Sequence, residues 1–188
     1  ANFTLNYLSL DKTYRQSLDQ NFDAEYGLPV NVVRRAHGDG SLNSTGAFVN
    51  AELPVTDELK LYAFGGFNNK SSEAYAFSRN FSGKPNRFIT NTSGQLVDIP
   101  GIIKKSGDTN TATADSYFNP IIATDVQDFS AAVGIRRENP DGWNWDLSNV
   151  TGQNNFHFYG EKTVNASLGD VNKNHFDDGG FKFLQNTT

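Results

Sequence analysis

The sequence has neither cysteine nor methionine among its 188 residues. The lack of cysteine excludes a disulfide framework, a thiolate metal site and a cysteine nucleophile. The net charge of -5 argues against a nucleic-acid surface, because phosphate binding requires clustered lysine and arginine. There is also no basic leader and no long apolar run, so neither a signal peptide nor a membrane-spanning helix is predicted. We expect a mature or excised piece whose targeting signal lay upstream.

Motifs of catalysis are also missing. The three histidines, His37, His157 and His175, have no second histidine or acid at metal-ligand spacing. Asp177 and Asp178 are adjacent, whereas glycoside hydrolysis needs two carboxylates that face each other across a cleft. No nucleophile-elbow, Walker or dinucleotide-binding stretch occurs. The sequence therefore predicts neither an enzyme nor a cofactor site.

Alternation with a period of two is the pattern that does occur, and no stretch repeats apolar residues at helical spacing over three turns. Apolar side chains alternate with small or polar ones from Thr45 to Leu53 and again from Leu59 to Phe67. The connection "PVTD", from Pro54 to Asp57, is short enough for a tight turn. These residues predict two antiparallel strands joined as a hairpin.

A second hairpin follows the same plan. Phe129 to Ile135 alternates, and the stretch beginning at Trp143 and Trp145 alternates again after a turn. Proline favours an early turn position and glycine accepts a positive φ later in the turn. The turn residues are Asn139, Pro140, Asp141 and Gly142.

The connections between strands are very unequal in length. Residues 11–43, 80–127 and 160–180 are long and polar, while both short turns fall at the opposite end of the strands. Short turns on one side, long loops on the other and strands of about 9 to 11 residues are typical of outer-membrane β-barrels. A soluble sheet with one solvent-exposed face gives the same alternation, so the pattern is consistent with both an outer-membrane barrel and a soluble sheet.

The segment "SLGDVNKNHFDDGGFKF" has oxygen-bearing side chains at the spacing of a calcium loop. Asp170, Asn172, Asn174 and Asp178 occupy its first, third, fifth and ninth positions. The sixth position is His175 and the twelfth is Phe181, where a calcium loop of the EF-hand type needs glycine and a bidentate acid. We therefore expect a polar surface loop, with a calcium site as the weaker alternative.

Several motifs occur together in one order from Leu42 to Thr188, and this set resembles the barrel of TonB-dependent outer-membrane receptors. The turn "NAELP" is followed by "YAF" and by an arginine-bearing strand at Arg79. "GWNWD" then runs into a Gly-x-Asn-x-Phe stretch, "NASLG" follows, and "FDDGG" closes the set. The residues of the later motifs include Gly142, Trp143, Trp145, Asn154, Asn165, Ser167 and Gly169.

The resemblance implies that residues 1–188 are part of such a barrel, without a plug domain, from the outer membrane of a Gram-negative bacterium. The expected fold is all-β, with antiparallel up-and-down hairpins of about five strands and the start of another at "FKFLQ", against about 22 strands in a plugged transporter barrel. The parent would take up a scarce ligand such as a ferric siderophore, with TonB, the plug and outer-membrane lipid as partners. The chain alone is not expected to transport, and its strand edges are expected to self-associate.

Ligand contacts are expected in the long loops. Arginine and aromatic side chains supply most anchoring energy at binding sites, which selects Arg79, Tyr117 and Phe118 as candidates. The alternative function is a soluble all-β binding module of a secreted or surface protein, with the calcium site at 170–178.

Overall fold

The computed structural model describes residues 1–16, 36, 38–80, 85–89, 92–93, 117–171 and 173–188. These residues form one antiparallel sheet of six strands in the order β1-β2-β3-β6-β7-β8, and a separate pair β4-β5. The predicted all-β antiparallel fold is confirmed. The strands are β1 (Asn2–Leu10), β2 (Ser41–Pro54), β3 (Leu59–Tyr75), β4 (Arg79–Asn80), β5 (Tyr117–Phe118), β6 (Ile121–Arg137), β7 (Trp145–Glu161) and β8 (His175–Thr187).

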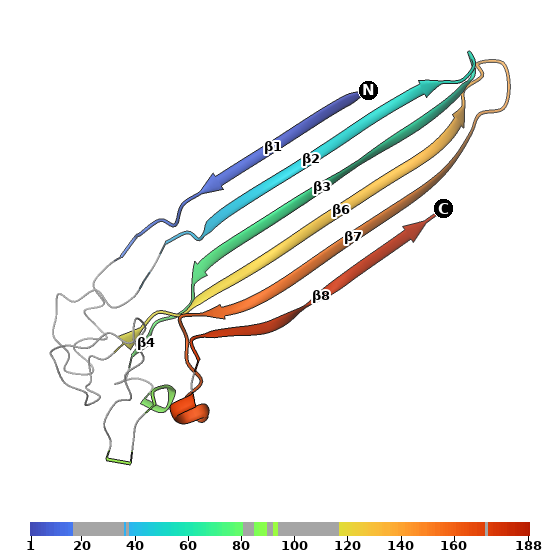
Figure 1. The fold of residues 1–188 in the computed structure, drawn as a ribbon. Helices are drawn as coiled ribbons and strands as arrows, with labels where there is room; N and C mark the ends of the chain where they lie inside the picture. The colour runs from blue at the N-terminus through green and yellow to red at the C-terminus, as the bar shows by residue number, and fades with distance from the viewer. Residues whose placement is uncertain (17–35, 37, 81–84, 90–91, 94–116, 172) are drawn as a thin grey trace.

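Each strand of the large sheet lies beside its neighbour in the sequence (Figure 1). The two tight turns, 55–58 and 138–144, lie together at one end, and the longer connections lie at the other. Both hairpins predicted from alternation are present, with Ala51 opposite Ala63 in the first and Val133 opposite Asn149 in the second. In the part of the chain that the structure describes, no helix is long and apolar enough to cross a membrane.

The strands are longer than the alternation predicted. β3, β6 and β7 have 17 residues each, and β8 is a full strand of 13 residues that begins at His175. The sheet thus contains the five expected strands and a sixth, β8, which was expected only as a start at "FKFLQ" and is a full strand. The expected loop 160–180 is correspondingly shorter, 162–174. Backbone hydrogen bonds to the neighbouring strands, on both sides of β3, β6 and β7 and on the β7 side of β8, extend these strands through polar segments without apolar alternation.

Side chains shape both tight turns. The Thr56 hydroxyl accepts hydrogen bonds from the backbone amides of Glu58 and Leu59, at 3.3 and 3.0 Å. In the other turn the Asn139 side chain accepts a hydrogen bond from the amide of Asp141 at 2.9 Å. The backbone carbonyl of Asn139 accepts one from the amide of Gly142 at 3.4 Å. The predicted turn at 139–142 is present and is closed by the Asn139 side chain, whereas Gly142 does not have the positive φ that was expected of it.

Glu58 ties the two turns together. Its carboxylate accepts from Nε and Nη2 of Arg137, at 2.9 and 2.7 Å, and from Nδ2 of Asn139 at 2.9 Å. Its backbone carbonyl accepts from the amide of Glu138 at 2.8 Å. One residue therefore holds the β2-β3 turn beside the end of β6.

Replacing Glu58→Gln is expected to lower the free energy of unfolding by about 0.5 to 1 kcal/mol, because it weakens a two-pronged ion pair that is partly exposed. Urea unfolding of the chain in detergent micelles measures this change. Asp57→Asn makes the same chemical change at the neighbouring residue and is expected to have no measurable effect. Equal urea midpoints for the two variants would show that the hydrogen bonds of the Glu58 carboxylate contribute nothing to stability.

The small core lies at the loop end of the sheet. Phe88 and Phe118 are buried and pack edge to face with ring centroids 5.3 Å apart. Ile89 and Ile121 are also buried, and Ile121 is the first residue of β6 at this end of the sheet. Of the apolar side chains in the turn-side half of the large sheet, only Ala132 is buried in the described structure. The sheet is thus a single layer whose two broad faces are open.

Candidate functional site

The residue register gives the sheet one apolar face at its turn end. Alternate side chains of neighbouring strands fall in rows, such as Leu53, Leu61, Ile135 and Leu147. We call the whole set the apolar band. Its members are Phe3, Leu5, Ala47, Val49, Ala51, Leu53, Leu59, Leu61, Ala63, Phe67, Phe129, Ala131, Val133, Ile135, Leu147 and Leu184.

Most of the larger side chains of the apolar band are exposed, while Leu59 and Ile135 are half-buried. Leu5 is 71% exposed, Leu147 62% and Val133 56%. Soluble monomers rarely expose contiguous apolar patches larger than a few hundred Å². The band is continuous over β1, β2, β3 and β6, and an exposed apolar surface of this kind is a candidate interaction surface. At the same level on β7 and β8 this face is mostly polar, with Asn149, Thr151, Gln153 and Asn186.

The height of the band matches one crossing of a bilayer. On β3 it runs from Leu59 to Phe67, and a tilted strand needs about 9 to 11 residues to cross. Above the pair Phe67 and Phe129 the same face becomes polar, with Asn69 beside Gln127 as the next row. Trp145 lies on the same face at the turn end, where interfacial aromatic residues gather. The apolar stretch is thus bounded at both ends while the strands continue.

The opposite face is more polar at the same level, although it also carries Phe48 and Phe64. Near the turns, Arg136 pairs with Glu52 at 2.7 Å and Lys60 pairs with Glu138 at 2.7 Å. The Tyr62 hydroxyl donates to Asp146 at 2.8 Å, one strand beyond its neighbour. These contacts span β2, β3, β6 and β7, so the charged network crosses most of the sheet.

A row of amides and one acid crosses the middle of this polar face. Asn68 lies opposite Asp128 and accepts from Ser44 at 2.9 Å. Asp128 accepts from Asn154 at 2.6 Å. Asn6 continues the row at the β1 side, above Gly46, where a Cβ would overlap its side-chain oxygen.

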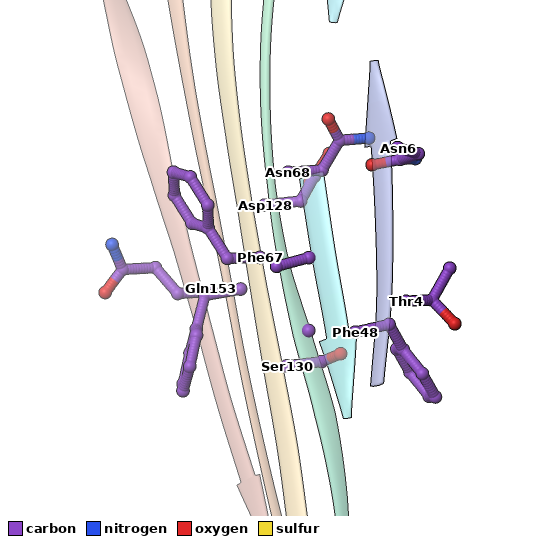
Figure 2. A pocket seen from close by; sticks show the side chains of 11 residues that line it. Thr4, Asn6, Phe48, Phe67, Asn68, Asp128, Ser130 and Gln153 are labelled. Carbon is purple, nitrogen blue, oxygen red and sulfur yellow. The ribbon is translucent and has the colours of Figure 1, made fainter. Parts of the chain in front are cut away.

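A shallow groove of about 400 Å³ lies beside this row, over Gly66. Figure 2 shows Thr4, Asn6 and Phe48 on one side of the strands and Phe67 and Gln153 on the other. Successive residues of a strand thus point to opposite faces, although Phe48 lies on the mainly polar face and Gln153 on the face of the band.

The three loop candidates for ligand contact come together. Arg79 lies opposite Phe118 where β4 pairs with β5, and Tyr117 is the residue before Phe118 in β5. Phe118 is buried against Phe88, and Arg79 donates to the carbonyl of Phe77 at 3.0 Å. Burial and the positive charge of Arg87 lower the pKa of Arg79. Phe118 therefore serves packing, while ligand contact by Arg79 and Tyr117 stays a prediction.

The calcium candidates do not form one loop. Asn172 lies outside the described residues, and Asp170 lies in a 3₁₀ segment, Ala166–Val171. Asp178 lies inside β8, and the carbonyl of Asn174 accepts from the amide of Thr163 at 3.4 Å. Among the described residues no group of three or more histidines and acids is placed to hold a metal ion. The calcium site stays a prediction.

The remaining motif residues act on local structure. The Asn165 side chain accepts from the amide and the hydroxyl of Ser167, at 3.1 and 2.7 Å, and Gly169 has φ 56°. These contacts turn the chain between β7 and β8. Pro54 ends β2, and Trp143 is 86% exposed beside the 138–144 turn.

A cluster that the sequence did not predict lies on the loop-side part of the band's face. His157 pairs with Asp177, His175 pairs with Glu161, and Tyr159 lies between the two histidines. Spacing along the chain gave no signal, because the partners come from different strands. Only the β7-β8 register brings them together.

These features define an antiparallel sheet with an apolar and a polar face. No family model, curated protein or solved structure matches the chain. Functional inference therefore depends on the physical properties of the two faces and on the motifs in the sequence.

Proposed function

We propose that this chain is part of the barrel wall of a TonB-dependent outer-membrane receptor that takes up a scarce ligand such as a ferric siderophore. One observation carries the proposal: an exposed apolar band of single-bilayer height lies on one face of β1, β2, β3 and β6, and the other face of these strands is more polar. In this arrangement the band contacts lipid and the polar face lines the lumen. The long connections face outward, and the turns at Pro54 and Pro140 face the periplasm.

The edges of the sheet support membership of a larger barrel. Among the residues that the structure describes, no strand pairs with the outer edges of β1 and β8. In lipid, unpaired backbone groups cost several kcal/mol each, so membrane-spanning sheets close into barrels. We therefore propose further strands on both sides, with the plug and TonB as partners in the whole protein. The chain alone transports nothing and performs no bond chemistry, and in isolation its edges pair with other copies.

The lipid contact can be tested with single-cysteine labels, because the chain has no native cysteine. Ala131→Cys lies on the band's face and Ser130→Cys on the polar face of the same strand. In vesicles that contain brominated lipid, a fluorophore at 131 is expected to be quenched and blue-shifted, and one at 130 is not. Equal responses at the two positions would overturn the membrane assignment.

The receptor assignment has a separate test in the coding sequence around these residues. We expect an upstream plug domain and further alternating strands, and loss of growth on a ferric siderophore when the whole gene is deleted. Flanks that encode neither plug nor strands would overturn the receptor assignment, even if the labels show lipid contact.

A further inference from the structure

Two histidine-carboxylate pairs join β7 and β8 at their loop ends. The Nε2 atom of His157 lies 2.5 Å from Oδ1 of Asp177, and Nδ1 of His175 lies 2.5 Å from Oε1 of Glu161. Tyr159 lies between them, with its ring centroid 4.5 Å from that of His157 and 5.8 Å from that of His175. These five side chains form one continuous cross-strand cluster.

The backbone pairing is interrupted within this cluster. Tyr159 lies opposite Asp177 and His157 opposite Gly180, so β8 has one extra residue there. Gly179 has φ 80°, as in a bulge with a left-handed glycine, and its amide donates to the Asp177 carboxylate at 2.9 Å. Because a bulge removes ladder hydrogen bonds, the two side-chain pairs carry more of the strand pairing here.

The charged groups around the histidines are mostly acidic. Asp125 of β6 lies opposite His157, and Glu161 and Asp177 face the cluster from β7 and β8. Lys182 lines the groove beside His157. Asp11 and Glu73 line the same groove as His175, and Glu73 pairs with Lys12. The carboxylates thus outnumber the lysines, and their mutual repulsion is relieved when the imidazoles become positive.

We propose that this cluster is a pH-sensitive clasp: protonated His157 and His175 hold β8 against β7, and their deprotonation loosens the loop ends of both strands. The clasp depends on side chains of this chain alone, so it stands independently of the transport proposal. Histidine is the side chain that changes charge between pH 5 and 8, which places the change within the range that a cell surface meets.

The direction of the pH effect follows from the pairs. The hydrogen bond from His157, and then that from the Gly179 amide, hold the pKa of Asp177 below its usual value. A lowered carboxylate pKa adds stability that is present above its unfolded value and lost as pH falls through its folded value. A positive imidazole attracts the carboxylate beside it and a neutral imidazole does not, so the clasp weakens as rising pH removes the histidine charge.

Amide hydrogen exchange of the full chain in detergent micelles tests the clasp, with rates corrected for the pH dependence of intrinsic exchange. Between pH 5.5 and pH 7.5, protection of amides in 157–161 and 175–180 is expected to fall about tenfold. Protection in β2 and β3 is expected to stay constant and serves as the internal check on folding. Unchanged protection in the β7-β8 segments would overturn the proposal.

The double variant His157→Gln and His175→Gln is expected to lose this pH dependence while the β2-β3 protection persists. His37→Gln removes the third histidine, which lies outside the described residues, and is expected to behave like the unchanged chain. A second variant, Asp177→Asn with Glu161→Gln, keeps the histidines and removes their partners, and is also expected to show no pH dependence. A wild-type response in either double variant would contradict the clasp.

Discussion

Val133→Lys is expected to destabilise the folded chain in lipid by about 2 to 4 kcal/mol, because it places an ammonium group at the middle of the apolar band. Val133 lies in the row of Ala51 and Ala63, halfway along the band, and it is 56% exposed. In lipid the lysine must be desolvated or must bend the bilayer toward itself. Urea unfolding from lipid vesicles, followed by electrophoretic mobility of unheated samples, measures the change.

The matched control is Ser130→Lys, on the polar face of the same strand. Ser130 is exposed and lies in the row of Gly66 and Gly152, so the new charge stays in water. We expect a change within about 0.5 kcal/mol, as for ordinary surface substitutions. On a soluble sheet both variants would be nearly neutral. Equal midpoints for the two lysines would therefore favour the soluble binding module over a membrane wall.

Gly180→Ala is expected to lower the free energy of unfolding by about 1 to 3 kcal/mol, because there is no room for its methyl group. A Cβ at this position would overlap the carbonyl oxygen of Phe156 and lie 2.9 Å from the Cα of His157. Both obstacles are backbone atoms, which move only if β8 separates from β7. Hydrogen exchange should show the loss first in the amides next to the bulge.

Gly152→Ala makes the same change in β7 at an open position. Its new Cβ would meet only the carbonyl oxygen of Phe129, at 3.8 Å, which is an ordinary contact. We expect this variant to be more stable by about 0.4 to 1 kcal/mol, since alanine restricts the unfolded chain. Destabilisation of both variants to the same extent would show that glycine itself, and not the close approach at Gly180, is what the strands require.

The parts of the fold that the sequence predicted have local causes. Alternation around Val49, Ala63 and Val133 needs only a period of two, and Asn139 closes its turn with its own side chain. The hairpins and both tight turns were therefore readable in advance. The length of the strands was not, because Asp125 and His157 lie in polar stretches that are held by neighbouring backbones.

The site divides in the same way. Alternation alone indicated an apolar face, and the motif set indicated a family whose barrel would use that face against lipid. Phe118 was predicted at a ligand surface but lies buried against Phe88, because its burial depends on a contact 30 residues away in the chain. The spaced aspartate and asparagine residues from Asp170 to Asp178 matched part of a calcium-loop pattern, yet Asp178 lies in a strand.

By itself, the sequence determined that this protein is all-β, that its hairpins turn tightly at one end, and that each strand has an apolar and a less apolar side. Those properties follow from periodicity and turn chemistry, which act between residues close in the chain. Tertiary structure alone decided how far the strands extend, which rows align into a band, and that His157 and His175 meet Asp177 and Glu161. The reason is strand register, since pairing between distant segments selects which side chains become neighbours.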